Sequence, residues 1–130
     1  MLLKWNKLYS VNVKEIDDQH KKIFEIINRL YHVHKNIDKG DLEEILNELE
    51  NYAKYHFSTE EKYFNKFSYS DKENHIKTHE WYIQKIAEFK KRNINTIMND
   101  LLKFLRDWWL GHVQAVDIKY SDFFNQHGLF

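Results

Sequence analysis

The chain contains no proline and only three glycines, Gly40, Gly111 and Gly128, among its 130 residues. Proline interrupts helices and glycine supplies many tight turns, so a sequence this poor in both has few places to reverse direction. Sandwiches and barrels need many such reversals, whereas a bundle of long helices needs few. The sequence therefore predicts an all-α protein built from long helices.

Composition excludes several kinds of site and partner. The chain has no cysteine, which excludes disulfides, thiolate metal sites, iron–sulfur clusters and cysteine nucleophiles. Its 20 basic and 20 acidic residues give a formal net charge of zero with no basic stripe, so we expect no nucleic-acid partner. Because no apolar run has the length of a signal peptide or a membrane span, we expect a cytoplasmic protein without membrane insertion.

Apolar residues recur at helical spacing in four segments that follow an irregular N-terminal arm of roughly residues 1–16. The four stripes begin at Ile16, Leu42, His75 and Ile97. Short connections between long helices make neighbours antiparallel, so we expect an up-down-up-down antiparallel four-helix bundle over about residues 17–120. With the arm and a short C-terminal tail, residues 1–130 are expected to form one domain.

Local signals suggest where these helices begin and end. Gly40 is expected to close the first helix, and DLEE at 41–44 resembles the start of the second. SDKE at 70–73 has the same capping pattern, and Asn93 or Asn95 is expected to cap the fourth helix.

Ionisable side chains lie on stripes that are otherwise apolar. They are His20, His56, Glu60, His75, His79 and His112. For any one of them alone, a hydrogen-bonded core residue is the better interpretation. Together, burying a carboxylate and several imidazoles costs on the order of several kcal/mol per ion without compensation. Glu60 follows His56 by one turn and His79 follows His75 by one turn, so each pair projects from one side of its helix. We therefore predict a metal centre in the core of the bundle.

Asp117 would complete this set only if the helix is distorted. It follows His112 by five residues, which in an ideal α-helix places the two about 140° apart. A single π-type turn would bring them together, and such turns are frequent at functional sites. Gly111 is expected to ease the distortion.

In order along nearly the whole chain, the sequence contains WNKLYSVNVKEIDDQH, HFSTEE, HIKTH and WWLGHVQAVDIKY. The first stretch resembles an N-terminal arm that leads into Asp-x-Gln-His. The others resemble the motifs His-Phe-x-x-Glu-Glu, His-x-x-x-His and Trp-Leu-x-x-His-Ile-x-x-x-Asp. Together these stretches resemble the hemerythrin family, and in particular its single-domain bacterial type.

The resemblance implies a four-helix bundle that holds two iron ions bridged by an oxo or hydroxo group. Imidazole and carboxylate ligands also accept zinc or manganese, so iron follows from the family and not from the ligand set. The implied ligands are His75, His79 and His112 for one iron, His20 and His56 for the other, and Glu60 and Asp117 as bridges.

The count of ligands leaves room for one small molecule. Two six-coordinate metals offer about twelve positions, and the five imidazoles, two bridging carboxylates and shared oxygen fill all but one. The open position lies on the iron with two histidines. The resemblance implies that O2 binds there reversibly, so we expect an oxygen carrier, store or delivery protein and not an enzyme. We expect the O2 pocket to be apolar and to be lined by Ile23, Phe24, Phe57, Trp108, Trp109 and Val113. Each of these residues is also compatible with an ordinary role in the hydrophobic core.

The sequence departs from the family pattern beside the predicted pocket and in one turn. Trp109 stands where the family usually has leucine, so it is expected to narrow access, slow exchange or hydrogen-bond a bound ligand. Val113 replaces the more usual isoleucine. Ser68 and Ser70 replace the glycine and proline of a turn, which is expected to affect the loop more than the chemistry.

Three other functions stay open at this point. They are an oxygen or redox sensor that acts through a separate partner, a di-iron peroxidase or enzyme that handles nitric oxide, and a structural zinc bundle. We expect a monomer whose partners are O2 and an oxygen-consuming enzyme. His32, His34 and His127 match no ligand position and are expected to be ordinary residues.

Overall fold

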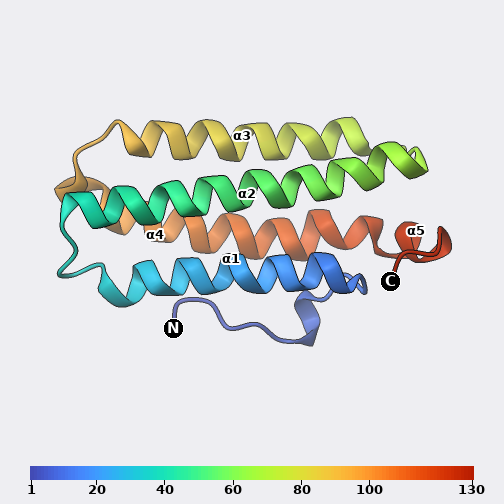
Figure 1. Ribbon diagram of the computed structural model, residues 1–130, viewed down its shortest axis with the longest axis horizontal. Coiled ribbons are helices and arrows are strands. Elements are labelled where there is room, and N and C mark those ends of the chain that lie inside the picture. Colours follow the sequence, from blue (N-terminus) through green and yellow to red (C-terminus); the bar gives the residue numbers. More distant parts are fainter.

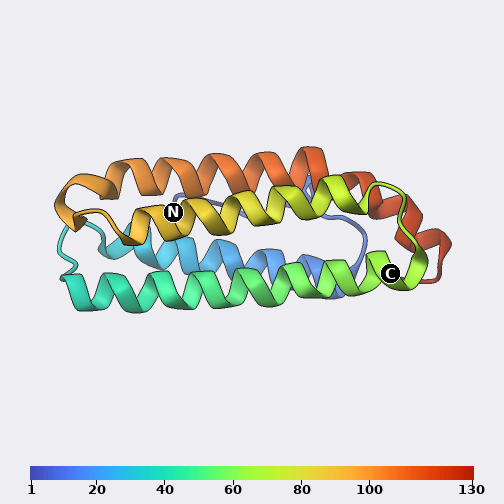
Figure 2. The same cartoon turned by 90° about the horizontal axis from the view of Figure 1, so that it is seen from above.

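The computed structural model describes the backbone of residues 1–130 and all side chains except those of residues 94 and 95. Four long helices make up most of the chain: α1 (Lys14–Val33), α2 (Lys39–Phe67), α3 (Lys72–Lys90) and α4 (Ile94–Gly111). The four lie side by side and alternate in direction (Figures 1 and 2). The predicted all-α, antiparallel four-helix bundle is confirmed.

Short elements lie at one end of this bundle. The turn η1 (Lys7–Tyr9) lies in the N-terminal arm, which runs along α1 before the helix begins (Figure 1). The π turn η2 (His112–Val116), the 3-10 turn η3 (Asp117–Tyr120) and α5 (Ser121–Gln126) follow α4 without interruption. Among the described residues, no helix is long and apolar enough to cross a membrane.

The helix boundaries differ from those predicted. Gly40 lies inside α2 and does not end α1, because Asp38 caps α2 by accepting a hydrogen bond from the Asp41 N–H at 2.8 Å. The N-cap residue of α3 is Asp71 and not Ser70, and it makes no side-chain capping hydrogen bond, so the capping box predicted at 70–73 is not formed. α4 begins at residue 94, and the side chain of residue 95, one of its two predicted caps, lies outside those described.

The residue after α2 has an unusual backbone conformation. Ser68 adopts a left-handed conformation with φ 55° and ψ 51°, and its N–H donates to the Phe64 carbonyl. Glycine is the usual residue at such a helix end because it has no Cβ to clash. Ser68 therefore stores backbone strain at the turn where the sequence lacks the expected glycine.

Two hydrophobic clusters meet inside the bundle. The larger runs between the four long helices and includes the fully buried Leu30, Leu49, Ile86 and Leu105. The smaller closes the end near α5 and joins residues of the arm, α1, α2, the loop after it, η3 and α5: Val11, Val13, Ile16, Phe64, Tyr69, Tyr120 and Phe124. The polar residues that the sequence places on apolar stripes lie where these two clusters meet.

Hydrogen bonds hold the N-terminal arm on the bundle. The Leu3 backbone donates to Asn28 Oδ1 at 2.8 Å and accepts from Asn28 Nδ2 at 2.7 Å. Asp17, in the first turn of α1, accepts from the Ser10 hydroxyl at 2.6 Å and from the Val11 N–H at 2.8 Å. The arm thereby covers the part of α1 that carries the candidate ligand nearest the N-terminus.

Candidate metal centre

The π turn after α4 brings its two candidate ligands to one side. The Asp117 N–H donates to the His112 carbonyl, five residues back, which adds one residue to the turn. His112 Nε2 consequently lies 2.9 Å from Asp117 Oδ1. The predicted π turn is confirmed. Gly111 has ordinary helical angles, and a Cβ built there meets nothing within 4 Å, so the expectation that it eases the distortion has no support.

Regular helical spacing aligns the other pairs. His56 and Glu60 lie one turn apart on α2, with His56 Nε2 3.0 Å from Glu60 Oε1. His75 and His79 lie one turn apart on α3, with ring centroids 4.6 Å apart. His20 reaches the same region from α1, so all four long helices or their extensions contribute a side chain.

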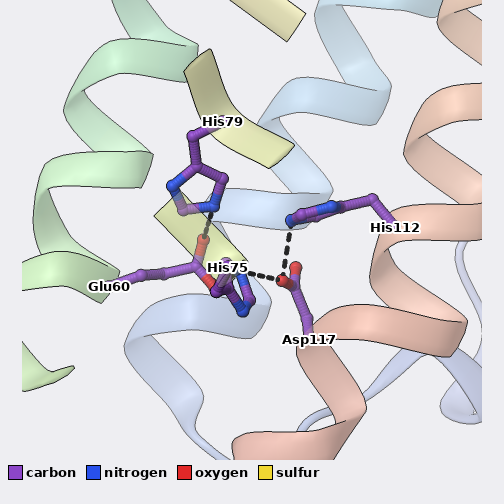
Figure 3. A group of neighbouring side chains, drawn as sticks. All are labelled: Glu60, His75, His79, His112 and Asp117. Carbon is purple, nitrogen blue, oxygen red and sulfur yellow. Dashed lines mark ion pairs between the residues drawn. The ribbon is translucent and has the colours of Figure 1, made fainter. Parts of the chain in front are cut away.

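The seven predicted metal ligands come together in two groups that share both carboxylates. One group contains Glu60, His75, His79, His112 and Asp117 (Figure 3). The other contains His20, His56, Glu60 and Asp117. In each group, one ligand atom from every residue lies within 4.8 Å of the others. The first group therefore contains three histidines and the second contains two.

The distances between ligand atoms within each group match the distances expected between neighbouring ligand atoms around one metal ion. Two ligand atoms that lie about 2.1 Å from an ion, at right angles, are about 3.0 Å apart. His20 Nε2 lies 3.1 Å from His56 Nε2 and 3.0 Å from Asp117 Oδ2. On the other side, His75 Nε2 lies 2.9 Å from Asp117 Oδ1. The two oxygens of Asp117 thus face different groups, as a bridging carboxylate requires.

The nitrogen and oxygen atoms of the candidate ligands are buried, and most of them have no hydrogen-bond partner among the described residues. All seven side chains are buried, none more than 4% exposed. Among the described side chains, the oxygens of Glu60 and Asp117 and the Nε2 atoms of His75, His79 and His112 face one another but make no hydrogen bond. Unpaired buried ions cost on the order of several kcal/mol each. Converging nitrogen and oxygen atoms with no other partner are the donor set that a metal ion satisfies, so the residues fit a pair of ions.

A chain of hydrogen bonds sets the tautomer of His56. The Thr59 hydroxyl donates to the Tyr55 carbonyl at 3.2 Å, so it accepts from the Gln19 amide nitrogen at 3.1 Å. The Gln19 carbonyl oxygen then faces His56 Nδ1 at 2.7 Å and accepts its proton. His56 Nε2 is left with a free lone pair that points into the two-histidine group.

Similar contacts orient two histidines of the other group. His79 Nδ1 donates to Glu61 Oε2 at 3.0 Å. The Thr78 hydroxyl donates to the His75 carbonyl at 2.6 Å and accepts from His112 Nδ1 at 3.4 Å. In the neutral form of both histidines, Nε2 is therefore the unprotonated atom, which is the form that binds a metal.

The carboxylates are held in their ionised form. Burial alone would raise the pKa of Asp117, but the imidazoles of His112, His20 and His75 outweigh burial and hold that pKa well below its usual value. Burial and the charge of Asp117 would also raise the pKa of Glu60, but His56 and the other nearby imidazoles hold it below its usual value. Both side chains are thus ready to bind cations at neutral pH.

The pKa values of His56 and His79 shift in opposite directions. Burial lowers the pKa of His56, which favours the neutral ring. Burial would also lower the pKa of His79, but the nearby carboxylates of Glu60 and Glu61 raise it to about 9. A metal ion that binds His79 must therefore displace a proton over much of the pH range.

The six residues predicted to line an O2 pocket all belong to the larger cluster. Five are buried and Trp108 is half-buried: Ile23, Phe24, Phe57, Trp108, Trp109 and Val113. Phe57 stacks on His79 with ring centroids 3.9 Å apart, and the Trp109 ring lies 6.1 Å from His56, in the two-histidine group. Trp108 stacks on His112 and thus lies beside the three-histidine group, away from the expected open position. Their role as an O2 pocket stays a prediction.

Trp109 is fully buried and has a specific partner. Its indole Nε1 donates to the Tyr82 hydroxyl at 3.2 Å, and its ring stacks on Phe57 with centroids 5.8 Å apart. The N–H is already engaged, which argues against the expectation that Trp109 hydrogen-bonds a bound ligand. The packing instead supports the expectation that Trp109 narrows the space beside His56.

The sequence interpretation missed several residues around the site. Gln19 precedes His20, and Glu61 follows Glu60, so each lies next to a predicted ligand in the sequence. That position was the signal by which they could have been identified. Tyr82 follows His79 by three residues, on the same face of α3. Tyr120 stacks on His75 with centroids 5.6 Å apart, and its buried hydroxyl has no hydrogen-bond partner among the side chains that the structure describes. No sequence signal distinguished Tyr120 from an ordinary core aromatic.

Comparison with known proteins gives consistent matches over most of the chain. A family model described as the Hemerythrin HHE cation binding domain matches residues 11–121. The bacteriohemerythrin of Clostridium acetobutylicum is 32% identical over 126 residues, covering 91% of this chain and 98% of that protein. A hemerythrin-like protein of Naegleria gruberi is 29% identical over 117 residues, covering 90% of this chain and 89% of that protein.

Solved structures agree with the sequence matches. The crystal structure of a wild-type hemerythrin superposes with a TM-score of 0.85 at 28% sequence identity, covering 94% of this chain and 97% of that chain. The matched region includes every helix that carries a candidate ligand. From its bundle, its His, Glu and Asp cluster and these matches, we conclude that the chain belongs to the hemerythrin family.

Proposed function

We propose that this protein binds O2 reversibly at a non-haem di-iron centre, as an oxygen carrier, store or delivery protein without catalytic turnover. The observation that carries the proposal is the inequality of the two donor groups, which share Glu60 and Asp117 but differ by one imidazole. In a pair of six-coordinate ions, that inequality leaves an open position beside His20 and His56.

The donor set and the family together support iron. Imidazole and carboxylate ligands suit iron, zinc and manganese alike, and membership of the hemerythrin family favours iron among them. One ion would be held by His75, His79 and His112, the other by His20 and His56, with Glu60 and Asp117 as bridges. When bound, the iron pair supplies the open position and the electrons that reversible O2 binding requires.

The remaining residues of the site orient ligands and exclude water. Gln19, Glu61 and Thr78 present the Nε2 lone pairs of three histidines to the site. Phe57 and Trp109 cover the side of the site toward the core with apolar rings. Because a dry site delivers few protons, it favours release of the ligand unchanged over irreversible oxidation of the centre.

The proposal extends to the organisation of the chain. Residues 1–130 would act as one domain, because the arm and α5 are joined across the end of the bundle by a hydrogen bond from the Ser121 hydroxyl to the Val11 carbonyl at 2.6 Å. We propose a monomer that supplies O2 to an oxygen-consuming enzyme.

Metal content and a visible absorption spectrum test this function. Protein loaded anaerobically with Fe2+ should gain a charge-transfer band in air and lose it under argon. The variant His56→Ala should lose the band, whereas His32→Ala, which removes an exposed histidine outside the site, should keep it. Rapid decay to a ferric spectrum that argon does not reverse would favour a sensor or an enzyme. Colourless protein that contains zinc and no iron would favour a structural zinc bundle.

A further inference from the structure

The N-terminal arm carries an aromatic side chain to the edge of the two-histidine group. Trp5 lies beside His20, with ring centroids 6.5 Å apart. Its indole is half-buried, whereas the His20 side chain is fully buried. Because the arm runs along the outside of α1 (Figure 1), Trp5 lies between this candidate ligand and solvent.

The other aromatic rings beside this group are buried in the core. Phe57 and Trp109 lie beside His56 and are 3% and 0% exposed. Both belong to the larger hydrophobic cluster. Of the aromatic rings that the structure describes beside His20 and His56, Trp5 is therefore the one that solvent reaches.

A groove on the outside of the bundle has the same indole in its wall. It has a volume of about 1410 Å³ and lies between the arm, α1 and the first turns of α2. Trp5 and Phe24 both line it and make an edge-to-face contact, with centroids 5.8 Å apart. Tyr9 packs on both rings, 5.9 Å from Trp5 and 5.7 Å from Phe24 between centroids. Because Trp5 also lies beside His20, displacement of the indole would connect the groove with the two-histidine group.

Two contacts hold Trp5 in place. Leu3, two residues earlier, makes two backbone hydrogen bonds to the Asn28 side chain, and its own side chain is buried. The ammonium of Lys21 lies over the Trp5 ring, 5.4 Å from its centroid. Such a cation on an exposed ring favours the closed position by about two- to five-fold.

A second anchor lies beyond Trp5. The Val11 N–H donates to Asp17 at 2.8 Å, and the Val11 carbonyl accepts from the Ser121 hydroxyl at 2.6 Å. Release of Leu3 would therefore free the stretch that carries Trp5 while Val11 stays in place. A short stretch with few anchors opens locally at a lower cost than unfolding of the whole bundle.

We propose that Trp5 is the gate through which O2 reaches and leaves the two-histidine group, and that the gate opens when Leu3 releases Asn28. The proposal rests on the proposed function, because it concerns exchange of the O2 held in that group. The rate of O2 release is then set by the fraction of molecules in which the arm is open. The closed arm retains the ligand and keeps bulk water away from His20.

The absence of cysteine allows the opening of the arm to be measured directly. In the variant Leu3→Cys, the buried thiol should react with iodoacetamide only while the arm is open, in metal-free and iron-loaded protein alike. Adding Asn28→Ala removes both hydrogen bonds to the backbone of residue 3 and should raise the labelling rate roughly 10–30-fold. The rate of O2 release, followed by stopped-flow absorption, should rise by the same factor. The control Trp81→Ala, which removes an exposed ring on α3, should change neither rate.

A further substitution separates the gate from general loosening of the arm. Trp5→Ala removes the ring and should accelerate O2 release at least as much as Asn28→Ala does. Adding Asn28→Ala to Trp5→Ala should raise the labelling rate again but leave O2 release unchanged, because no ring is left to displace. Labelling that Asn28→Ala leaves unchanged, or O2 release that does not follow labelling, would overturn the gate. A further rise of O2 release in the combined variant would overturn the role of Trp5.

Failure of the gate and failure of the proposed function give different results. Iron-loaded protein without a reversible O2 band would contradict the proposed function. The rate at which azide binds the diferric centre, followed by visible absorption, then tests the gate with the same variants and the same expected ratios. Protein that binds no iron would overturn both proposals.

Discussion

Trp109 offers the sharpest test of how this site is packed. Replacing it with leucine, the residue that the family resemblance implies at this position, removes the buried indole that lies against Phe57 and His56 and that donates to the Tyr82 hydroxyl. Both the indole and Tyr82 are 0% exposed, so neither can turn to water without a rearrangement.

The expected loss of stability has two parts. Truncating a buried tryptophan to alanine costs about 3–5 kcal/mol, and leucine retains roughly half of the apolar volume, which leaves a cost of about 2 kcal/mol. Leaving the buried Tyr82 hydroxyl without its donor adds about 1 kcal/mol. The free energy of unfolding of Trp109→Leu should therefore fall by about 3 kcal/mol.

Urea denaturation of the metal-free protein measures this loss, because bound metal would add its own stabilisation. Adding Tyr82→Phe to Trp109→Leu removes the unpaired hydroxyl and should recover about 1 kcal/mol, although Tyr82→Phe alone destabilises the protein. As a control, Trp81→Leu at a half-exposed position should change stability by less than about 0.5 kcal/mol.

The same variant tests whether Trp109 restricts ligand exchange. With a smaller side chain beside His56, O2 should leave the iron-loaded protein faster, which stopped-flow absorption would detect. A Trp109→Leu protein as stable as the parent would refute the packing argument. An unchanged rate of O2 release would refute the restriction.

Four further predictions concern ligand support, protonation and the backbone. Glu61→Gln weakens the acceptor for His79 Nδ1–H, so metal affinity measured by competition with a chelator should fall about 10–100-fold, and an unchanged affinity would contradict a supporting role. Metal affinity should rise with pH up to about 9, because the ion displaces a proton from His79, whose pKa lies at about 9. A titration that finds the same affinity at neutral pH and at pH 9 would refute that linkage. Ser68→Gly relieves a positive φ and should raise the free energy of unfolding by about 1 kcal/mol in thermal denaturation, whereas Ser70→Gly, which has no positive φ to relieve, should not. Gly111→Ala should stabilise α4 by up to about 1 kcal/mol without changing metal content, and loss of metal would show that this glycine matters to the π turn.

Features set by spacing along a helix could be predicted from the sequence. His56 with Glu60 and His75 with His79 share faces because four residues make about one turn. The five-residue spacing of His112 and Asp117 violates that rule, and the violation itself predicted the π turn. In each case the predicted site requires ligands on one side of a helix, and the spacing of the residues indicates which local structure places them there.

Features that depend on the choice among nearby alternatives could not be predicted. Asp38 and Asp41 both suit the start of α2, and the structure has the earlier one as the cap. The direction of the Trp108 and Trp109 rings depends on side-chain rotamers, which helical spacing alone does not fix. The buried hydroxyl of Tyr120 likewise becomes unusual only when α5 and the arm close over it.

The position of Asp117 in the chain has a consequence for the order of assembly. Both donor groups include this residue, which follows α4, yet the histidine that faces its Oδ2, His20, lies on α1. During synthesis neither group is complete until residue 117 has left the ribosome. A chain that lacks residue 117 has neither complete donor group, so tight metal binding requires that all four helices of the bundle have been made.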